Sequence, residues 1–169
     1  MPGSGPHRPG ILTDDANGCE AGSGDGMART MIHVDASREA VWAVLSNAYT
    51  YDHWVVGCKE IRGVDGVWPE PGATFHHSVG MGPITIKDST SVTASDAPRR
   101  LVLRARARPT GIVRVELDLA AAGDGTEVVM TEVPVEGPPA MLHNPLQDWL
   151  IDRRNREALR RLKQLAERA

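Results

Sequence analysis

The sequence predicts an α+β fold: a seven-stranded antiparallel sheet wrapped around a long C-terminal helix, with two short helices after the first strand. Two observations support this prediction. From Cys58 to Val135, apolar and polar residues alternate in segments broken by Gly, Pro and Asp, a pattern typical of strands joined by hairpin-sized links. From His143 to Ala169, apolar residues recur at helical spacing. The apolar face of the sheet needs a cover, so this helix should lie on it.

The first residues have the composition of a disordered leader. Residues Met1 to Gly26 hold seven of the seventeen glycines and three prolines but few apolar side chains, so burial would not offset the entropy of ordering them. The segment also lacks the apolar centre of a secretory signal. We therefore expect a leader over residues 1–26 and a single domain over residues 27–169. Two interpretations of the leader stay open, a natural tail or a true start at Met27.

The elements of the domain follow from local patterns. A strand is expected from Arg29 to Val34, then a helix that Ser37 caps and that ends near Asn47. Four of the seven aromatic residues lie between Trp42 and Trp54, and a second short helix or a tight loop fits at the end of this stretch. The six strands that follow are predicted at Cys58–Val64, Ala73–Val79, Ile84–Ala94, Leu101–Arg108, Ile112–Ala120 and Glu127–Val135.

The C-terminal helix should bury one side. At about 100° per residue, that side carries Ile151, Asn155, Ala158, Leu159, Leu162, Leu165, Ala166 and Ala169. Charged residues cover the opposite side, which is typical of a solvated face. In the first turns a second apolar set, Leu146, Trp149 and Leu150, points the other way, and we expect it to contact protein as well.

Composition limits the classes of function. A hydrophobic content of 41%, a net charge of -3 and a pI near 6.1 predict a soluble globular protein and argue against a nucleic-acid binder. No apolar run approaches the roughly 18 residues needed to span a bilayer, so no membrane insertion is expected. Cys19 and Cys58 form no CxxC pair, which fits a cytoplasmic protein without a disulfide framework. The oligomeric state is left open.

A family resemblance rests on several segments in a fixed order. They are DASREAVWAVLSN, YDHWVVGCKEIRGVDG, PGATFHHSVGMGP, DAPRRLVLRARARPTG, GDGTEVVMTEVP and NPLQDWLIDRRNREALRRLKQLAE. Their order and spacing between Met27 and Ala169 resemble the SRPBCC superfamily, also called START-like or Bet v 1-like, and particularly its polyketide cyclase and dehydrase branch. The resemblance implies a helix-grip fold that encloses a pocket for a small hydrophobic molecule. It implies no single chemistry, since relatives include carriers, cyclases, aromatases, hydrolases, co-chaperones and toxin components.

Eight residues are candidates for contact with such a ligand. They are Trp54, Phe75, His77, Leu103, Met130, Glu132, Ile151 and Asn155. If Phe75 faces inward, strand alternation brings His77 inward as well. An interior histidine can serve as a general acid or base, although interior histidines are more often simply hydrogen-bonded in the core. Trp54 is expected on a loop near the pocket mouth.

The polar candidates carry open alternatives. Asn155 interrupts the apolar helix stripe, and a buried amide needs a hydrogen-bond partner. That partner is either a ligand carbonyl or hydroxyl, or a backbone group or water. Glu132 faces inward only if Met130 does, and both parities of this last strand offer apolar residues. An inward carboxylate would be a candidate general base.

Three function hypotheses follow. The first is a protein that binds or carries a small hydrophobic molecule of the lipid, polyketide or aromatic type. The second is an enzyme of the cyclase, aromatase or dehydrase type, in which His77, Asn155 or Glu132 would orient a carbonyl and move protons. The third is a protein-interaction module of the co-chaperone or toxin type. No sequence pattern indicates a metal site, and no cofactor is expected.

Overall fold

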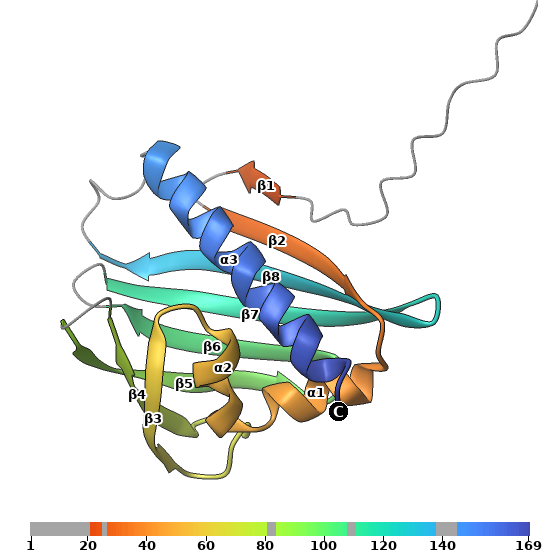
Figure 1. Ribbon diagram of the computed structural model, residues 1–169. Coiled ribbons are helices and arrows are strands. Elements are labelled where there is room, and N and C mark those ends of the chain that lie inside the picture. The colour runs from red at the N-terminus through yellow and green to blue at the C-terminus, as the bar shows by residue number, and fades with distance from the viewer. Residues whose placement is uncertain (1–20, 25–26, 81–83, 108–110, 138–144) are drawn as a thin grey trace, which may run out of the picture.

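The computed structural model describes residues 21–24, 27–80, 84–107, 111–137 and 145–169. The strands are β1 (Ala21–Gly24), β2 (Met27–Val34), β3 (Cys58–Asp65), β4 (Thr74–Val79), β5 (Ile86–Asp96), β6 (Arg100–Ala107), β7 (Gly111–Ala122) and β8 (Gly125–Glu136). The helices are α1 (Arg38–Leu45), the 3-10 turn η1 (Ala48–Thr50), α2 (Tyr51–Trp54) and α3 (Pro145–Ala166). In Figure 1, α3 runs diagonally across the sheet. The predicted helix start at His143 lies outside the described residues.

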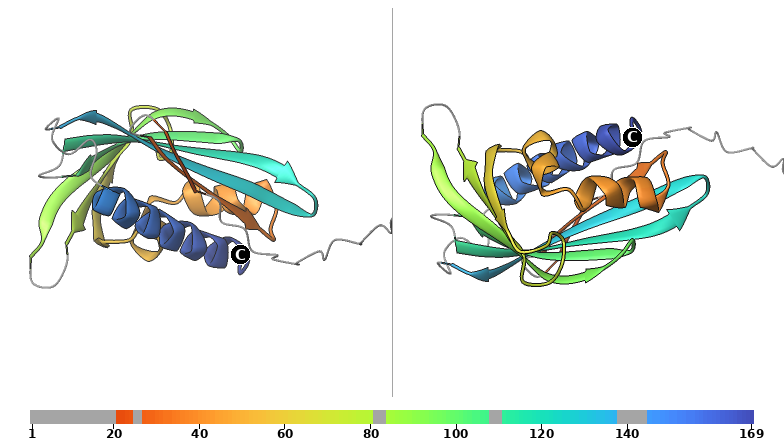
Figure 2. Two further views of the ribbon diagram at one scale, coloured as in Figure 1. Left: turned by 90° about the horizontal axis from the view of Figure 1, so that it is seen from above. Right: turned by 90° about the horizontal axis from the view of Figure 1, so that it is seen from below.

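The strands form one antiparallel sheet in the order β1-β2-β8-β7-β6-β5-β4-β3. The seven predicted strands are confirmed, and the first of them, β2, pairs with the last, β8. Register shifts interrupt the pairing in β3, β5 and β8, and such bulges bend a sheet. Figure 2 shows the result: the curved sheet holds α1, α2 and α3 on the same, concave side. This is the predicted helix-grip fold.

One short strand differs from the sequence-based expectation. Residues 21–24, which the composition places in the leader, form β1 and pair antiparallel with the start of β2, from Met27 to Thr30. Pairing of this kind uses backbone N–H and C=O groups, so a glycine-rich segment forms it without apolar side chains. The sheet therefore has eight strands.

The core lies between α3 and the concave face. On α3, the buried stripe is confirmed at Asn155, Ala158, Leu159, Leu162 and Ala166. Leu165 is partly buried, whereas Ala169 follows the end of the helix and is exposed. The α3 stripe packs mainly over β2, and α1 adds Val41, Val44 and Leu45 to the same core cluster.

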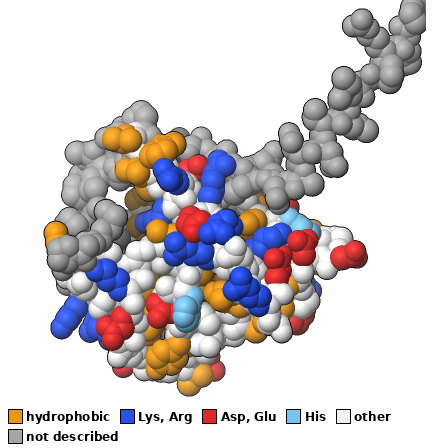
Figure 3. Space-filling view, in the orientation of Figure 1, with side chains coloured by type: hydrophobic (Ala, Val, Ile, Leu, Met, Phe, Trp, Pro, Cys, Tyr) orange, Lys and Arg blue, Asp and Glu red, His pale blue; other side chains and the backbone are white. Residues whose placement is uncertain are grey.

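The second apolar set of α3 is exposed, contrary to the prediction. Leu146 is 62% exposed, and Trp149 and Leu150 are each 52% exposed. The guanidinium of Arg153 lies over the Trp149 ring, 5.5 Å from its centroid. Figure 3 shows apolar side chains gathered at this end of α3 and mixed charges along the rest of its outer face. Because α1 and α2 share the concave side with α3, no helix of the described part covers this outer face.

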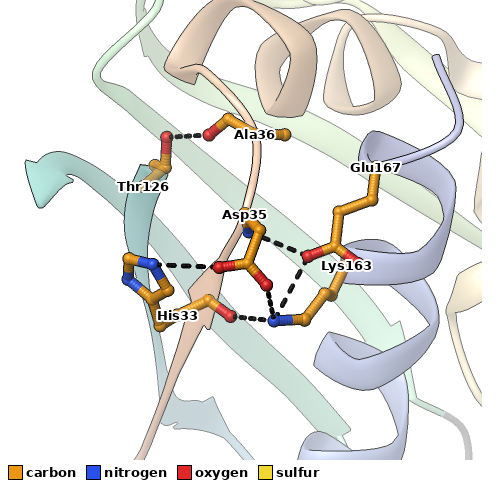
Figure 4. A network of polar contacts seen from close by, with 6 residues as sticks. All are labelled: His33, Asp35, Ala36, Thr126, Lys163 and Glu167. Atoms are coloured by element: carbon orange, nitrogen blue, oxygen red, sulfur yellow. Dashed lines mark hydrogen bonds and ion pairs between the residues drawn. The ribbon is translucent and has the colours of Figure 1, made fainter. Parts of the chain in front are cut away.

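A polar network holds the other end of α3 to the sheet (Figure 4). Lys163 Nζ donates to the backbone oxygen of His33 and to Asp35 Oδ2, both at 2.9 Å. Glu167 Oε1 accepts from the backbone N–H of Asp35 at 2.8 Å. The hydrogen bond and the charge of Lys163 lower the pKa of the Asp35 carboxyl below its ordinary value of 3.8. The last turn of α3 is thereby tied to the end of β2.

The packing of α3 makes a first prediction. Leu162 is fully buried, so Leu162→Ala should lower the free energy of unfolding by about 2 to 5 kcal/mol through lost burial and the cavity left behind. Denaturant unfolding followed by circular dichroism measures this change. The matched control is Gln164→Ala on the exposed side of the same helix, expected within about 0.5 kcal/mol of the unchanged protein. A Leu162→Ala protein as stable as this control would contradict the packing described here.

The Asp35 network makes a second prediction. A carboxyl whose pKa is lowered by folding stabilises the fold above its unfolded pKa and loses that contribution as the pH falls through its folded pKa. Asp35→Asn should therefore lower the melting temperature at pH 7, and the difference from wild type should shrink as the pH falls below 3.8. Melting curves of both proteins from pH 7 to pH 2.5 measure this. A constant difference over that range would show that the carboxylate charge contributes nothing.

Candidate functional site

The apolar candidates lie together on the concave face of the sheet. Phe75 on β4, Leu103 on β6 and Met130 on β8 are 3%, 4% and 3% exposed, respectively. All three belong to the same core cluster as the buried stripe of α3. Ile151, one helical turn before Asn155, is partly buried. The predicted set therefore converges on the interior between sheet and helix.

Asn155 is the most deeply buried polar candidate. It is 1% exposed, and its Oδ1 accepts hydrogen bonds from Nε and Nη2 of Arg154, both at 3.2 Å. Its Nδ2 has no hydrogen-bond partner among the described residues. A guanidinium can only donate hydrogen bonds, so this contact fixes which end of the amide is oxygen. The Nδ2 donors are left for another partner.

Glu132 faces inward, which decides the parity that the sequence leaves open. Val128 and Met130 are 0% and 3% exposed, and Glu132 follows on the same face with a side chain that is 12% exposed. Its two carboxylate oxygens lie 2.7 and 2.5 Å from Nη2 of Arg154. The carboxylate is therefore held in an ion pair that joins β8 to α3, and a base there would first have to leave that pair.

His77 is buried on β4, as alternation predicts, and is 6% exposed. Its Nε2 lies 3.2 Å from Thr90 Oγ1 on β5, and its Nδ1 has no partner in the described part of the chain. Burial lowers the pKa of this imidazole, and the nearby carboxylate of Asp88 partly opposes that effect. The ring is therefore neutral at pH 7, with one nitrogen hydrogen-bonded and one without a hydrogen-bond partner among the described residues.

Trp54 is not on a loop at a pocket mouth, as predicted, but is the last residue of α2 and only 2% exposed. Its ring packs 4.8 Å from Tyr51, whose ring also lies 4.8 Å from Phe75. The aromatic-rich stretch folds inward because its rings bury more apolar surface when packed against β4 than they would in an exposed loop. The indole Nε1 is buried without a partner among the described residues.

Two residues of this region were missed by sequence reasoning. Thr30 on β2 is 1% exposed, and its Oγ1 lacks a partner in the described ranges. Its alternation with Ile32 and Val34 would have indicated an inward position. Arg154 lies on the predicted solvated face, and no sequence signal separates it from the arginines around it.

Other features of the surface do not resemble this interior set. No group of three or more His, Cys, Asp or Glu side chains in the described ranges is placed to hold a metal ion. A hollow on the outer side of α3 is open to solvent and mostly lined by charged residues, namely Trp149, Asp152, Arg153, Arg156, Glu157 and Arg160. No helix of the described part has both the length and the apolar character that crossing a membrane requires.

Comparison with known proteins identifies the family. A family model described as polyketide cyclase / dehydrase and lipid transport matches residues 27–167. The chain belongs to this family. The match spans all of the segments on which the SRPBCC resemblance rests, and it confirms that resemblance. A search of curated proteins found no match.

Solved structures share the fold at low identity. A protein of Rhodobacter sphaeroides is 19% identical, with a TM-score of 0.67 over 90% of this chain and 100% of that one. Ara h 8.0201 is 10% identical, with a TM-score of 0.66 over 85% of this chain and 98% of that one. DynU16, from the dynemicin biosynthetic locus, is 17% identical, with a TM-score of 0.62 over 85% of this chain and 48% of that one. At these identities the likeness shows the fold alone.

The environment of His77 makes a third prediction. Because burial lowers its pKa, an NMR titration should place the midpoint of this imidazole below 6.5. The unfolded chain then binds the proton more readily than the folded one, so acidification from pH 6.5 should lower the free energy of unfolding. His77→Gln assigns the resonance and should remove this part of the pH dependence. A midpoint at or above 6.5 would contradict the buried, neutral imidazole described here.

Proposed function

We propose that this protein binds one small, largely apolar molecule between the concave face of the sheet and α3. The observation that carries the proposal is a set of buried polar atoms without described partners, on elements that also build the hydrophobic core: Thr30 Oγ1, Trp54 Nε1, His77 Nδ1 and Asn155 Nδ2. A buried polar atom left unsatisfied costs about 1 to 3 kcal/mol. Apolar walls with a few placed polar groups are typical of small-molecule sites, and the family description includes lipid transport.

The chemical type of the ligand is the finer part of the proposal. A polyketide-like, aromatic or lipid molecule suits the rings of Tyr51, Trp54 and Phe75. DynU16, which shares the fold, comes from a biosynthetic locus, which supports a metabolite of this kind. The proposal takes the protein to be cytoplasmic, as its cysteine usage predicts.

A second candidate function is catalysis of the cyclase or dehydrase type, and His77 is the observation that favours it. A neutral imidazole whose Nε2 is hydrogen-bonded to Thr90 can accept a proton at Nδ1. The carboxylate of Asp88, paired with His77 across β4 and β5, would stabilise the imidazolium formed. An enzyme would lose turnover but keep ligand affinity in His77→Gln, whereas a carrier shows no turnover in either protein.

Binding of a neutral apolar dye makes a fourth prediction. N-phenyl-1-naphthylamine should bind with a Kd in the micromolar range and brighten on leaving water. Ile151→Trp, which fills the interior beside Asn155, should weaken binding at least tenfold, a loss of about 1.4 kcal/mol. Fluorescence titration measures both constants.

The matched control is Gln164→Trp, which adds the same ring to the exposed side of α3 and should bind the dye like wild type. Native mass spectrometry of the purified protein then identifies a natural ligand by its mass. Equal binding by the two tryptophan variants would place the dye outside the interior. No binding by wild type would overturn the proposed function.

A further inference from the structure

Around Asn155 the described interior presents hydrogen-bond donors, whereas the buried carboxylate of Asp88 lies next to His77 on the neighbouring strand. Asn155 turns its oxygen to Arg154, so its buried Nδ2 can only donate. Trp54 Nε1, also buried without a described partner, is a donor only. Thr30 Oγ1 and His77 Nδ1 can each either donate or accept a hydrogen bond. The two groups that can only donate therefore need acceptor atoms on a ligand, whereas Thr30 and His77 can pair with a donor or an acceptor.

A residue of the sheet, Glu132 on β8, fixes the orientation of the Asn155 amide through Arg154. Arg154 reaches Asn155 Oδ1 with two nitrogens while its Nη2 lies 2.7 Å from Glu132 Oε1 on β8. Without this guanidinium, the amide could turn its oxygen inward and present an acceptor. Glu132 holds Arg154 in place, so this pair acts as a positioning device for the amide.

The same ion pair makes the region unsuited to an anion. The cation nearest Asn155 is already neutralised by Glu132, and the Glu132 side chain is only 12% exposed. A ligand carboxylate buried beside it would lose its hydration and meet a like charge, which is costly in a low-dielectric interior. A carbonyl oxygen accepts the same donors at a much smaller desolvation cost.

We infer that Glu132 and Arg154 set Asn155 as a donor, so that the protein selects a neutral ligand through a carbonyl-type acceptor oxygen over a hydrocarbon or a free acid. This inference rests on the proposed function, because it assigns the ligand chemistry of the same interior. It gives Glu132 a positioning role in place of the general-base role that its inward location would otherwise indicate.

Three tricyclic probes of similar shape test the inference by displacement of N-phenyl-1-naphthylamine. They are xanthone, which carries a carbonyl, 9,10-dihydroanthracene, which has no acceptor, and xanthene-9-carboxylate, which is an anion. Xanthone should bind about tenfold more tightly than either of the others, the effect of one well-placed hydrogen bond. Hydrocarbon or acid binding as tight as that of xanthone overturns the inference and leaves the proposed function standing. Failure of every probe and of the dye overturns both.

Variants of the buried hydrogen-bond donors show which residue causes the preference for xanthone. Asn155→Leu should remove most of the xanthone preference and leave the affinity for 9,10-dihydroanthracene unchanged or higher. Gln164→Leu, at an exposed amide of the same helix, is the matched control and should keep the preference. A full xanthone preference in folded Asn155→Leu overturns the assignment to Asn155. Where that variant does not fold, the Arg154 variants below test the same amide.

Variants of the ion pair test the positioning role. In a Glu132→Gln background, which leaves no buried carboxylate unpaired, Arg154→Met should reduce the xanthone preference roughly two- to fivefold, because the amide can then turn its oxygen inward. Arg154→Lys in the same background should retain more of the preference, since an ammonium also donates to that oxygen. Equal preferences in the two proteins would show that Arg154 does not orient the amide.

Discussion

The structure depends on burial of one stripe of α3 against the concave face of the sheet. Leu159 and Leu162 are fully buried there, and the small side chains of Ala158 and Ala166 let the helix approach the strands closely. The sheet can curve around the helix because bulges in β3, β5 and β8 bend it. Without α3, much of the apolar inner face of the sheet would meet water.

Burial along α3 changes from one end to the other. Near the C-terminal end of α3, the buried stripe is tightly packed and the Lys163 network ties the last turn to β2. Toward its start, Ile151 is partly buried, and Trp149 is 52% exposed. The well-packed end thus supplies stability, while the polar groups around Asn155 lie closer to the less buried end. Separation of these roles along one helix lets the interior hold unsatisfied donors without loss of the core.

The polar groups of the interior, more than the fold, bear on which ligand this chain would bind. The three solved structures named above share the fold at 10 to 19% identity, so the common architecture prescribes no particular ligand. The ion pair of Glu132 with Arg154 is partly open to water, since the Arg154 side chain is 44% exposed, and such a pair contributes little net stability. Its value in this protein lies in the orientation it gives to the neighbouring Asn155 amide.

Local periodicity in the sequence predicts the order and type of the elements after β1, the inward face of β4 and the buried stripe of α3. The inward parity of Glu132 comes from tertiary pairing, since apolar residues occupy both faces of β8 and pairing with its neighbours fixes the register. Tertiary packing also turned Trp54 inward, exposed Trp149 and brought Arg154 to Glu132 across 22 residues. Contacts between distant segments carry no local periodic signal, so these features could not be predicted from the sequence.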